Sequence, residues 1–265
     1  IYRSQRRGGK GISSITTRAE DFANDVLVTS LLAHVLFFTN QGRVFSLRAY
    51  QIPEASRQAK GTPLVNFIDL RPNERVTTLV AARYFDERRY LLMVTKRGII
   101  KKVDMASFAN IRRSGLIAVN LLEGDELVGV IRVEKKDLVM IATAKGFSIV
   151  FDQEQVRPMG RMATGVKAIR LGEGDFVVGM DKFRENSTVL LVTENGFGKR
   201  TPLSEFNIQN RGGKGLKSIE ITEKNGNLVD FRIVEEGDEL VMLTGEGQLI
   251  RLEVEDISIQ KRYSR

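Results

Sequence analysis

The chain has 265 residues, of which 42% are hydrophobic, and its formal net charge at pH 7 is +8. That length and hydrophobic content suffice for one large β domain or two ordinary domains. The absence of cysteine excludes disulfides and thiolate metal sites and favours a reducing compartment, and the absence of a run of about 18 apolar residues excludes a membrane-spanning helix.

The first feature along the chain is the basic segment Gln-Arg-Arg-Gly-Gly-Lys-Gly at 5–11. A glycine that ends a similar short basic segment recurs at Gly61, Gly115, Gly165 and Gly215, at steps of 50, 54, 50 and 50 residues. A sixth copy begins at Gln260 and is cut by the last residue of the sequence. This period identifies a repeat protein, and the truncated copies indicate a piece excised from a longer chain.

A second landmark, Thr-x-x-Gly, stands between consecutive basic segments. It occurs at 39–42, 95–98, 143–146, 193–196 and 244–247, and short apolar or alternating runs such as 34–38 and 43–47 flank it. Such runs around a tight glycine turn predict β-hairpins. With a further short run after each basic segment and another after an acidic turn, each repeat has about four strands. We therefore expect an all-β, propeller-like ring in a single domain, 1–265, and disfavour an open solenoid.

Positive and negative residues are distributed unevenly along each repeat. The six basic segments hold 13 of the 41 Lys and Arg residues and none of the 33 Asp and Glu residues, so the remainder of the chain is mildly acidic. Cations on glycine-containing loops suit phosphate groups, which points to a nucleic-acid backbone. The predicted contact residues are Gln5, Arg6, Arg7, Gly8, Gly9, Lys10 and Gly11 in the first segment, and Arg57, Lys60, Arg112, Arg113, Arg161, Lys167, Arg211, Lys214, Lys261, Arg262 and Arg265 in or just after the later ones.

Other charged residues have weaker interpretations. A second set of cations follows the Thr-x-x-Gly turns, and it either extends the phosphate track or protects strand edges from aggregation. That set comprises Arg43, Lys101, Lys102, Lys199, Arg200 and Arg251. The acidic pairs at 123–125 and 173–175 are expected to form turns.

No residue pattern indicates catalysis. His34 is the only histidine and lies within an apolar run, and no nucleophile with a base is visible. The first basic segment fails the P-loop pattern, because Ser4 and Gly11 stand where a glycine and a hydroxyl residue are needed. We expect no metal, no cofactor and no enzymatic activity in this chain by itself. Phenylalanines in strands do not suggest base stacking, so duplex binding is favoured over single-strand binding.

The segment 5–11 matches the GyrA-box motif in full, and the degenerate copies at 161–165 and 209–215, together with 194–201, resemble later blades of the same domain family. The chain thus resembles the C-terminal domain of bacterial DNA gyrase A over essentially its whole length. The resemblance implies a six-bladed β-pinwheel in which neighbouring blades exchange strands. It also implies that the domain binds double-stranded DNA at its basic rim, bends it and wraps it chirally, and that the first box is required for wrapping.

The same resemblance implies partners and a location. In the holoenzyme the wrap supports ATP-dependent negative supercoiling, so we expect the rest of gyrase A and the gyrase B protein as partners, a bacterial cytoplasmic location, and a monomeric isolated domain. The DNA-cutting tyrosine would lie in another domain, and none of Tyr2, Tyr50, Tyr84, Tyr90 and Tyr263 takes that role. The corresponding topoisomerase IV domain is the alternative, disfavoured by the intact box. A WD-type protein-interaction propeller is disfavoured by the lack of tryptophan.

Overall fold

The computed structural model describes residues 12–13, 27–55, 59, 61–86, 89–184, 186–243 and 248–264. The segment 5–11, Arg57, Lys60 and Arg265 lie outside these ranges. The described residues form β-strands joined by turns and short 3-10 helices, with no α-helix among them.

The strands are β1 (Ile12–Ser13), β2 (His34–Thr39), β3 (Arg43–Arg48), β4 (Val76–Ala82), β5 (Tyr90–Thr95), β6 (Ile99–Asp104), β7 (Leu116–Ile117), β8 (Leu127–Val133), β9 (Leu138–Thr143), β10 (Phe147–Asp152), β11 (Val166–Lys167), β12 (Val177–Phe183), β13 (Thr188–Thr193), β14 (Gly198–Pro202), β15 (Leu216–Lys217), β16 (Leu228–Val234), β17 (Glu239–Leu243) and β18 (Gln248–Glu253). The 3-10 helices are η1 (Ala49–Gln51), η2 (Leu64–Asn66), η3 (Met105–Phe108), η4 (Gln153–Gln155), η5 (Leu203–Glu205) and η6 (Val254–Asp256).

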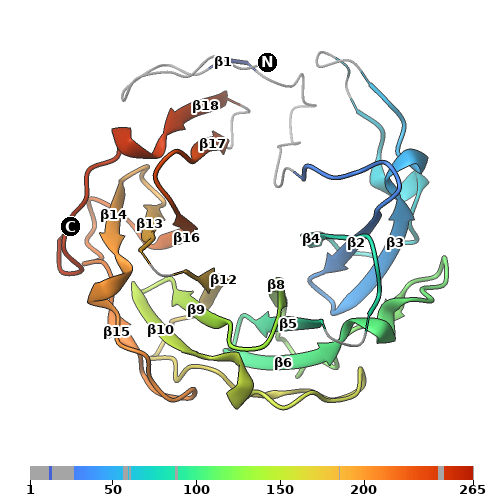
Figure 1. The fold of residues 1–265 in the computed structure, drawn as a ribbon, viewed down its shortest axis with the longest axis horizontal. Helices are drawn as coiled ribbons and strands as arrows, with labels where there is room; N and C mark the ends of the chain where they lie inside the picture. The colour runs from blue at the N-terminus through green and yellow to red at the C-terminus, as the bar shows by residue number, and fades with distance from the viewer. Residues whose placement is uncertain are drawn as a thin grey trace.

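The described strands make five antiparallel sheets around a common axis (Figure 1). In chain order they are the first sheet, β4-β2-β3-β7; the second, β8-β5-β6-β11; the third, β12-β9-β10-β15; the fourth, β16-β13-β14; and the fifth, β17-β18-β1. The inner strands β4, β8, β12 and β16 lie nearest the axis, and the two-residue strand β15 lies at the periphery. The two-residue strands β7 and β11 occupy the same outer edge of their sheets, opposite β4 and β8. The all-β, propeller-like prediction is confirmed.

Each sheet is assembled from several repeats. In the first sheet the hairpin β2-β3 pairs on its inner edge with β4 and on its outer edge with β7, which follows the next hairpin in the sequence. The second and third sheets repeat this arrangement with β11 and β15. The exchange of strands that the family resemblance implied is therefore present, and it ties every one of these sheets to its neighbours.

The Thr-x-x-Gly segments that the structure describes form the predicted hairpin turns. In each of the first four, the glycine N–H donates to the threonine carbonyl at 2.9 Å. The glycines at 42, 98, 146 and 196 have φ between +74° and +80°, a conformation that glycine adopts without steric cost. The turns also bond to the next sheet, through Leu127 N to Asn40 O at 3.0 Å, Val177 N to Lys96 O at 2.9 Å and Leu228 N to Ala144 O at 2.9 Å.

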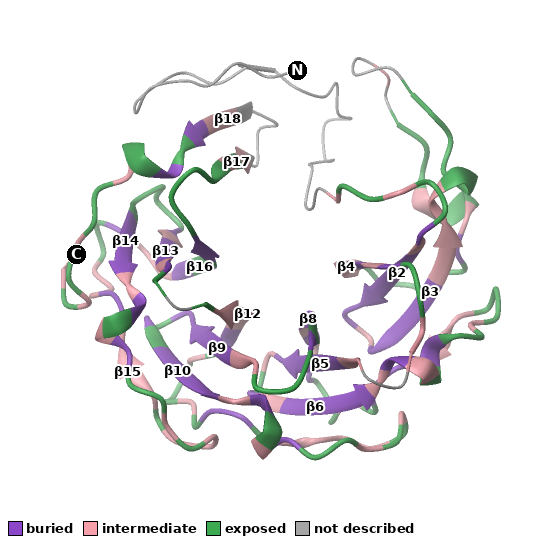
Figure 2. Ribbon diagram, in the orientation of Figure 1, coloured by how far each residue is buried: buried purple, intermediate pink, exposed green. Residues whose placement is uncertain are grey.

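The hydrophobic core is divided among the spaces between adjacent sheets. One cluster joins the first and second sheets around Phe38, Met93 and Phe108, and similar clusters join the second to the third and the third to the fourth. The hairpin strands are accordingly buried along most of their length, whereas the connecting loops are exposed (Figure 2). Burial thus fixes the hairpins and leaves the basic segments at the surface.

Candidate nucleic-acid interface

Three described basic segments lie at the outer edge of the ring because each leads directly into a peripheral strand. Gly115 precedes β7, Gly165 precedes β11 and Gly215 precedes β15, while β1 begins directly after Gly11. The described segments therefore recur around the periphery in the order of the sheets (Figure 1).

The glycine that ends three of the described segments is a packing requirement. Gly165 has φ +114°, and a Cβ at this position would lie 2.5 Å from Ile100 O on the preceding sheet. A Cβ at Gly115 would lie 2.7 Å from the Phe45 ring, and one at Gly215 would clash with Ser148 O. Gly61 is different, because nothing lies within 4 Å of its Cβ position. The other three glycines let their segments approach the sheet from which they project.

Five of the predicted contact residues are exposed: Arg112, Arg113, Lys167, Lys214 and Lys261. Within the described residues none of them forms an ion pair. Their positions on three different peripheral loops and one peripheral strand spread positive charge around the edge. Such groups can reach phosphates at little cost in desolvation.

Arg211 and Arg262 occupy equivalent positions in two basic segments and are half-buried. The Nη1 of Arg211 donates to Lys167 O at 3.0 Å, and that of Arg262 donates to Lys217 O, also at 3.0 Å. Arg211 Nε further donates to Gln155 O at 3.0 Å. Each guanidinium therefore links its own segment to the preceding repeat, a role that sequence reasoning missed when it treated both residues only as phosphate contacts.

A buried lysine supports each of two basic segments from beneath. Lys199 Nζ donates to Lys261 O at 2.9 Å and to Arg262 O and Ser264 O at 2.8 Å. Lys101 Nζ donates to Ala118 O at 3.0 Å and also to Arg161 O, so Arg161 is anchored through its main chain. Both lysines are about 1% exposed. A buried ammonium group therefore lies beneath each of these two basic loops.

Burial lowers the pKa of both lysines to about 8. For Lys101 the nearby Arg161 guanidinium lowers the pKa further. For Lys199 the Glu205 carboxylate opposes the effect of burial on the pKa, and Arg262 adds to it. In each case desolvation of the ammonium is the largest cause.

Arg43 plays a related part in the first sheet. Its Nη1 lies 2.7 Å from Glu74 Oε2, and both side chains are almost fully buried. Its Nη2 donates to Ser114 O at 2.5 Å and to Asp69 O at 3.4 Å, so the guanidinium joins a basic segment to the chain before β4. Arg43 also lies over the Phe45 ring, 4.7 Å from the ring centre.

The two interpretations of the cations after the hairpin turns are wrong for five of the six. Lys102 donates to Gln153 Oε1 at 2.8 Å and Arg200 Nε donates to Ile257 O at 2.7 Å; like Arg43, Lys101 and Lys199, both are buried. They neither extend an exposed track nor shield a strand edge. Arg251 is less buried and bonds to Glu239. The sequence did contain a signal of this burial: a lysine stands in an apolar strand at a position where other repeats have an apolar residue.

The histidine and the acidic pairs singled out in the sequence have structural roles. His34 Nδ1 lies 3.1 Å from Ser46 Oγ, and burial, followed by nearby Arg48, lowers its pKa. Asp125 N donates to Leu122 O at 3.0 Å and Asp175 N donates to Gly172 O at 3.3 Å, which confirms that the acidic pairs form turns. Their side chains bond to hairpin turns: Asp125 Oδ1 accepts from Arg97 N at 3.0 Å, and Asp175 Oδ1 accepts from Lys145 N at 2.9 Å. In the described ranges there is no cluster of three metal-ligating side chains and no helix able to cross a membrane.

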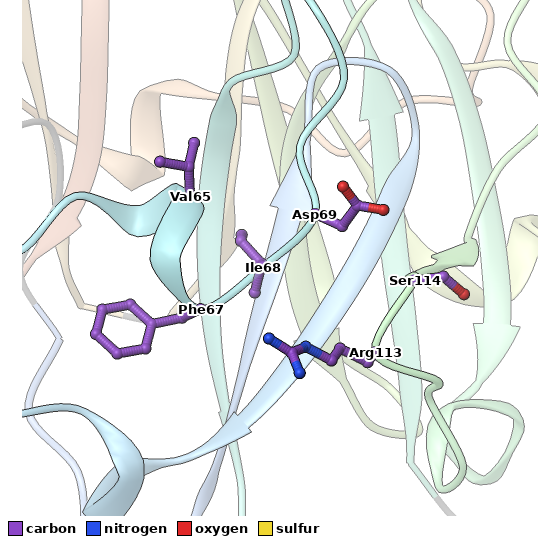
Figure 3. Close-up of a pocket in the computed structure, with 6 residues that line it drawn as sticks. All are labelled: Val65, Phe67, Ile68, Asp69, Arg113 and Ser114. Carbon is purple, nitrogen blue, oxygen red and sulfur yellow. The ribbon is translucent and has the colours of Figure 1, made fainter.

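A pocket of about 390 Å³ opens where the segment 109–115 meets η2. Figure 3 shows Arg113 and Ser114 from that segment on one side and Val65, Phe67, Ile68 and Asp69 on the other. Arg43 donates to the carbonyls of both Asp69 and Ser114 and so fixes the two walls. The pocket thus lies between the chain around η2 and a basic loop that Arg43 holds beside it.

Comparison with known proteins adds a family match to this geometry. The model of the DNA gyrase C-terminal domain, a β-propeller, matches residues 2–30, 33–83, 89–134, 137–184, 187–235 and 238–265. The number of matched ranges, six, agrees with the number of basic segments in the sequence. The described residues form five sheets.

Curated relatives are DNA gyrase A proteins. That of Halalkalibacterium halodurans is 54% identical over 264 residues, and that of Clostridium acetobutylicum is 50% identical over 261 residues, covering 100% and 98% of this chain. The Salmonella typhimurium protein is 41% identical over 264 residues. The chain spans only 30–32% of the length of these relatives.

Solved structures agree. A DNA gyrase A C-terminal domain matches all of this chain and 87% of its own length, with TM-score 0.89 and 28% identity. A topoisomerase IV C-terminal domain matches 89% of this chain and 74% of its own, with TM-score 0.80 and 25% identity. Similarity is therefore greater to the first of these two structures.

Proposed function

The chain belongs to the family of DNA gyrase C-terminal β-propeller domains, and from this premise we propose that residues 1–265 act as one unit that binds, bends and chirally wraps double-stranded DNA. In a full-length gyrase A protein this wrap would support ATP-dependent negative supercoiling by a type II topoisomerase. The rest of gyrase A and the gyrase B protein are the proposed partners, in the bacterial cytoplasm. DNA cleavage is assigned to a part of gyrase A outside this chain, and residues 1–265 would wrap DNA without a cofactor or metal of their own.

The observation that carries the proposal is the row of exposed cations at the outer edge. Arg112, Arg113, Lys167, Lys214 and Lys261 project from successive repeats, and the basic segments contain no acid. A duplex that follows the periphery would meet one repeat after another, with side chains directed at phosphates rather than bases. Wrapping would then depend on the spacing of the repeats, and any sequence preference would come from DNA bendability.

Electrostatic binding of this kind predicts a steep salt dependence. About ten engaged phosphates would give a slope near −9 for the logarithm of the association constant against the logarithm of salt concentration. Bending the duplex smoothly costs on the order of several kcal/mol, which contacts from several repeats must offset together.

We propose that Arg6, Arg7 and Lys10 complete the wrap, whereas the later segments supply most of the binding. By sequence register, Arg7 corresponds to Arg211 and Arg262, which link neighbouring repeats. A variant with alanine at the three positions should therefore keep much of its affinity and lose full wrapping.

The test is a linking-number assay with nicked circular plasmid. The chain is bound, the nick is ligated, the protein is removed and the topoisomers are separated on a gel, for the wild type and the Arg6→Ala, Arg7→Ala, Lys10→Ala triple variant. A signed shift that the variant loses, with salt-sensitive binding retained, is the expected result. Binding without any shift in the wild type would refute chiral wrapping, and equal loss of both properties in the variant would refute the division of labour.

A further inference from the structure

One position on the second strand of each hairpin holds lysine in two sheets and an apolar residue in three. Strand register places Phe45, Lys101, Ile149, Lys199 and Ile250 at equivalent positions, each paired with the residue two before the turn threonine. Lys101, Lys199 and Ile149 are all about 1% exposed. The fold therefore does not require a charged residue at this position, and an apolar side chain fits it without burying a charge.

The buried lysines are unfavourable for stability at neutral pH. Burial lowers the pKa of Lys101 and of Lys199 to about 8, which means that the folded protein disfavours the charged form relative to the unfolded chain. A charge that lowers stability, at a position where Ile149 serves in the third sheet, calls for an explanation other than folding.

The carbonyl groups that the lysines contact supply that explanation. Lys199 uses its three N–H donors on Lys261, Arg262 and Ser264, all within one basic segment. In a trans peptide the carbonyl oxygen and the following N–H point in opposite directions. With the Arg262 carbonyl turned to the ammonium, the Tyr263 amide faces away from it, and the exposed Lys261 side chain is carried on a fixed main chain.

We propose that Lys101 and Lys199 are positioning residues for DNA binding: they hold the basic segments 159–165 and 260–264 in the shape that presents cations and amides to a phosphate backbone. The inference rests on the proposed function. The third sheet shows the alternative solution: above Ile149 the Nε of Arg211 donates to Gln155 O at 3.0 Å, whereas above Lys199 the equivalent Nε of Arg262 has no hydrogen-bond partner among the described residues.

The test uses three variants of the whole chain: Lys199→Met, Lys101→Met, and Ile149→Met as the matched control at the same position. Affinity for a duplex is measured by fluorescence anisotropy over a range of salt concentrations, and stability by urea unfolding. Amide exchange of residues 260–264 is followed without DNA, so that loop order is read separately from binding.

We expect each lysine variant to bind several-fold more weakly, with a salt slope smaller by about 1. Its urea midpoint should stay equal to or above that of the wild type, because removing a buried charge offsets the loss of hydrogen bonds to the loop carbonyls. Amide exchange in 260–264 should accelerate in Lys199→Met. Raising the pH from 7 to 9.5 should weaken wild-type binding more than Lys199→Met binding, because Lys101 loses its charge in both proteins and only the wild type also loses the charge of Lys199. The charged groups facing Lys199 are Glu205 and Arg262, and Arg161 faces Lys101; carboxylates and guanidinium groups keep their charge over that range.

Other results separate the two proposals. Lysine variants with unchanged affinity, slope and loop exchange would overturn the positioning role while the wild type still bound DNA. Weaker binding that merely follows a lowered urea midpoint would overturn it too, since ordinary destabilisation would suffice. A wild type that binds no duplex would instead refute the proposed function, and amide exchange would still report whether Lys199 orders the loop.

Discussion

Arg43 in the first sheet and Lys199 in the fourth are both buried cations that donate to carbonyls of a basic segment, but they differ in what neutralises them. Glu74 Oε2 lies 2.7 Å from Arg43 Nη1, while the hydrogen-bond partners of Lys199 within the described residues are three carbonyl oxygens. The first arrangement is a neutral pair that braces the fold. The second leaves a net positive charge beneath a loop that we propose meets DNA.

The surroundings of Glu74 show how completely the first pair is built into the framework. Its carboxylate also accepts from Thr39 Oγ1 at 2.7 Å and from Arg71 N at 2.8 Å. It therefore links a hairpin turn, a second strand and the approach to β4. A buried pair satisfied on all sides contributes to stability mainly because removing one partner leaves the other unpaired.

The largest predicted effect is on this pair. Glu74→Ala should lower the free energy of unfolding by about 3–5 kcal/mol, because Arg43 would stay buried without its carboxylate. Urea unfolding of this variant is compared with Glu123→Ala, an exposed turn residue, whose loss should cost under about 0.5 kcal/mol. Equal stability of the two variants would show that Arg43, like Lys199, does without a counter-charge.

The hairpin turns of the same two sheets should also differ. A Cβ on Gly42 would lie 2.6 Å from Val119 O, whereas nothing lies within 4 Å of a Cβ on Gly196, and φ is positive at both. Gly196→Ala should cost about 1 kcal/mol from backbone strain alone, and Gly42→Ala at least about 1 kcal/mol more. Thermal or urea unfolding of the pair measures the difference; similar losses would mean that the first sheet relaxes around the added methyl group.

Raising the pH should sharpen the comparison. The pKa of Lys199 is about 8 when folded, against an ordinary value of 10.5. The unfolded chain binds more protons between these values, so Lys199 makes the unfolding free energy rise with pH there, by at most about 1.4 kcal/mol per pH unit. The stability of the wild type minus that of Lys199→Met should therefore increase from pH 8 to 10. A constant difference would indicate that the folded protein keeps Lys199 charged.

The smallest effects on stability are expected for exposed cations. Lys214→Ala and Lys261→Ala should each change the unfolding free energy by less than about 0.5 kcal/mol and reduce the salt slope of DNA binding by about 0.9. Arg211→Ala, in the same segment as Lys214, should cost about 1–2 kcal/mol, since its main-chain partners lose their donor. Identical behaviour of Lys214 and Arg211 would contradict their assigned roles.

The sequence was sufficient for the hairpins and for the repeat. Threonine and glycine at fixed spacing, with apolar runs on both sides, predicted turns that the structure confirms at 39–42, 95–98, 143–146 and 193–196. The strand exchange came only from the family resemblance. A two-residue strand such as β7 has too few residues for a periodic signal, and its partner β3 lies far back in the chain.

The orientation of the cations was beyond the sequence pattern. Lys101 and Lys199 follow hairpin turns in strands where an alternating pattern predicts that charged residues lie at the surface. Both are instead buried, and they donate to carbonyls of a segment about 60 residues later. Arg211 and Lys214 likewise share one basic segment, and only the structure shows that the first bonds inward. Long-range contacts of this kind decide which positive charges are available to a ligand.

The short strand β1 brings together residues from opposite ends of the sequence: Ile12 pairs with Leu249 and Ser13 with Gln248. Hairpins close over two or three residues and form early, but this pairing must close almost the entire chain for the sake of two residue pairs. The kinetic consequence is an order of events in which the repeats zip together locally and the terminal pairing forms last. During synthesis the N-terminal partner would wait until the last hairpin had emerged, so this junction is the step at which a folding chain is most open to a wrong partner.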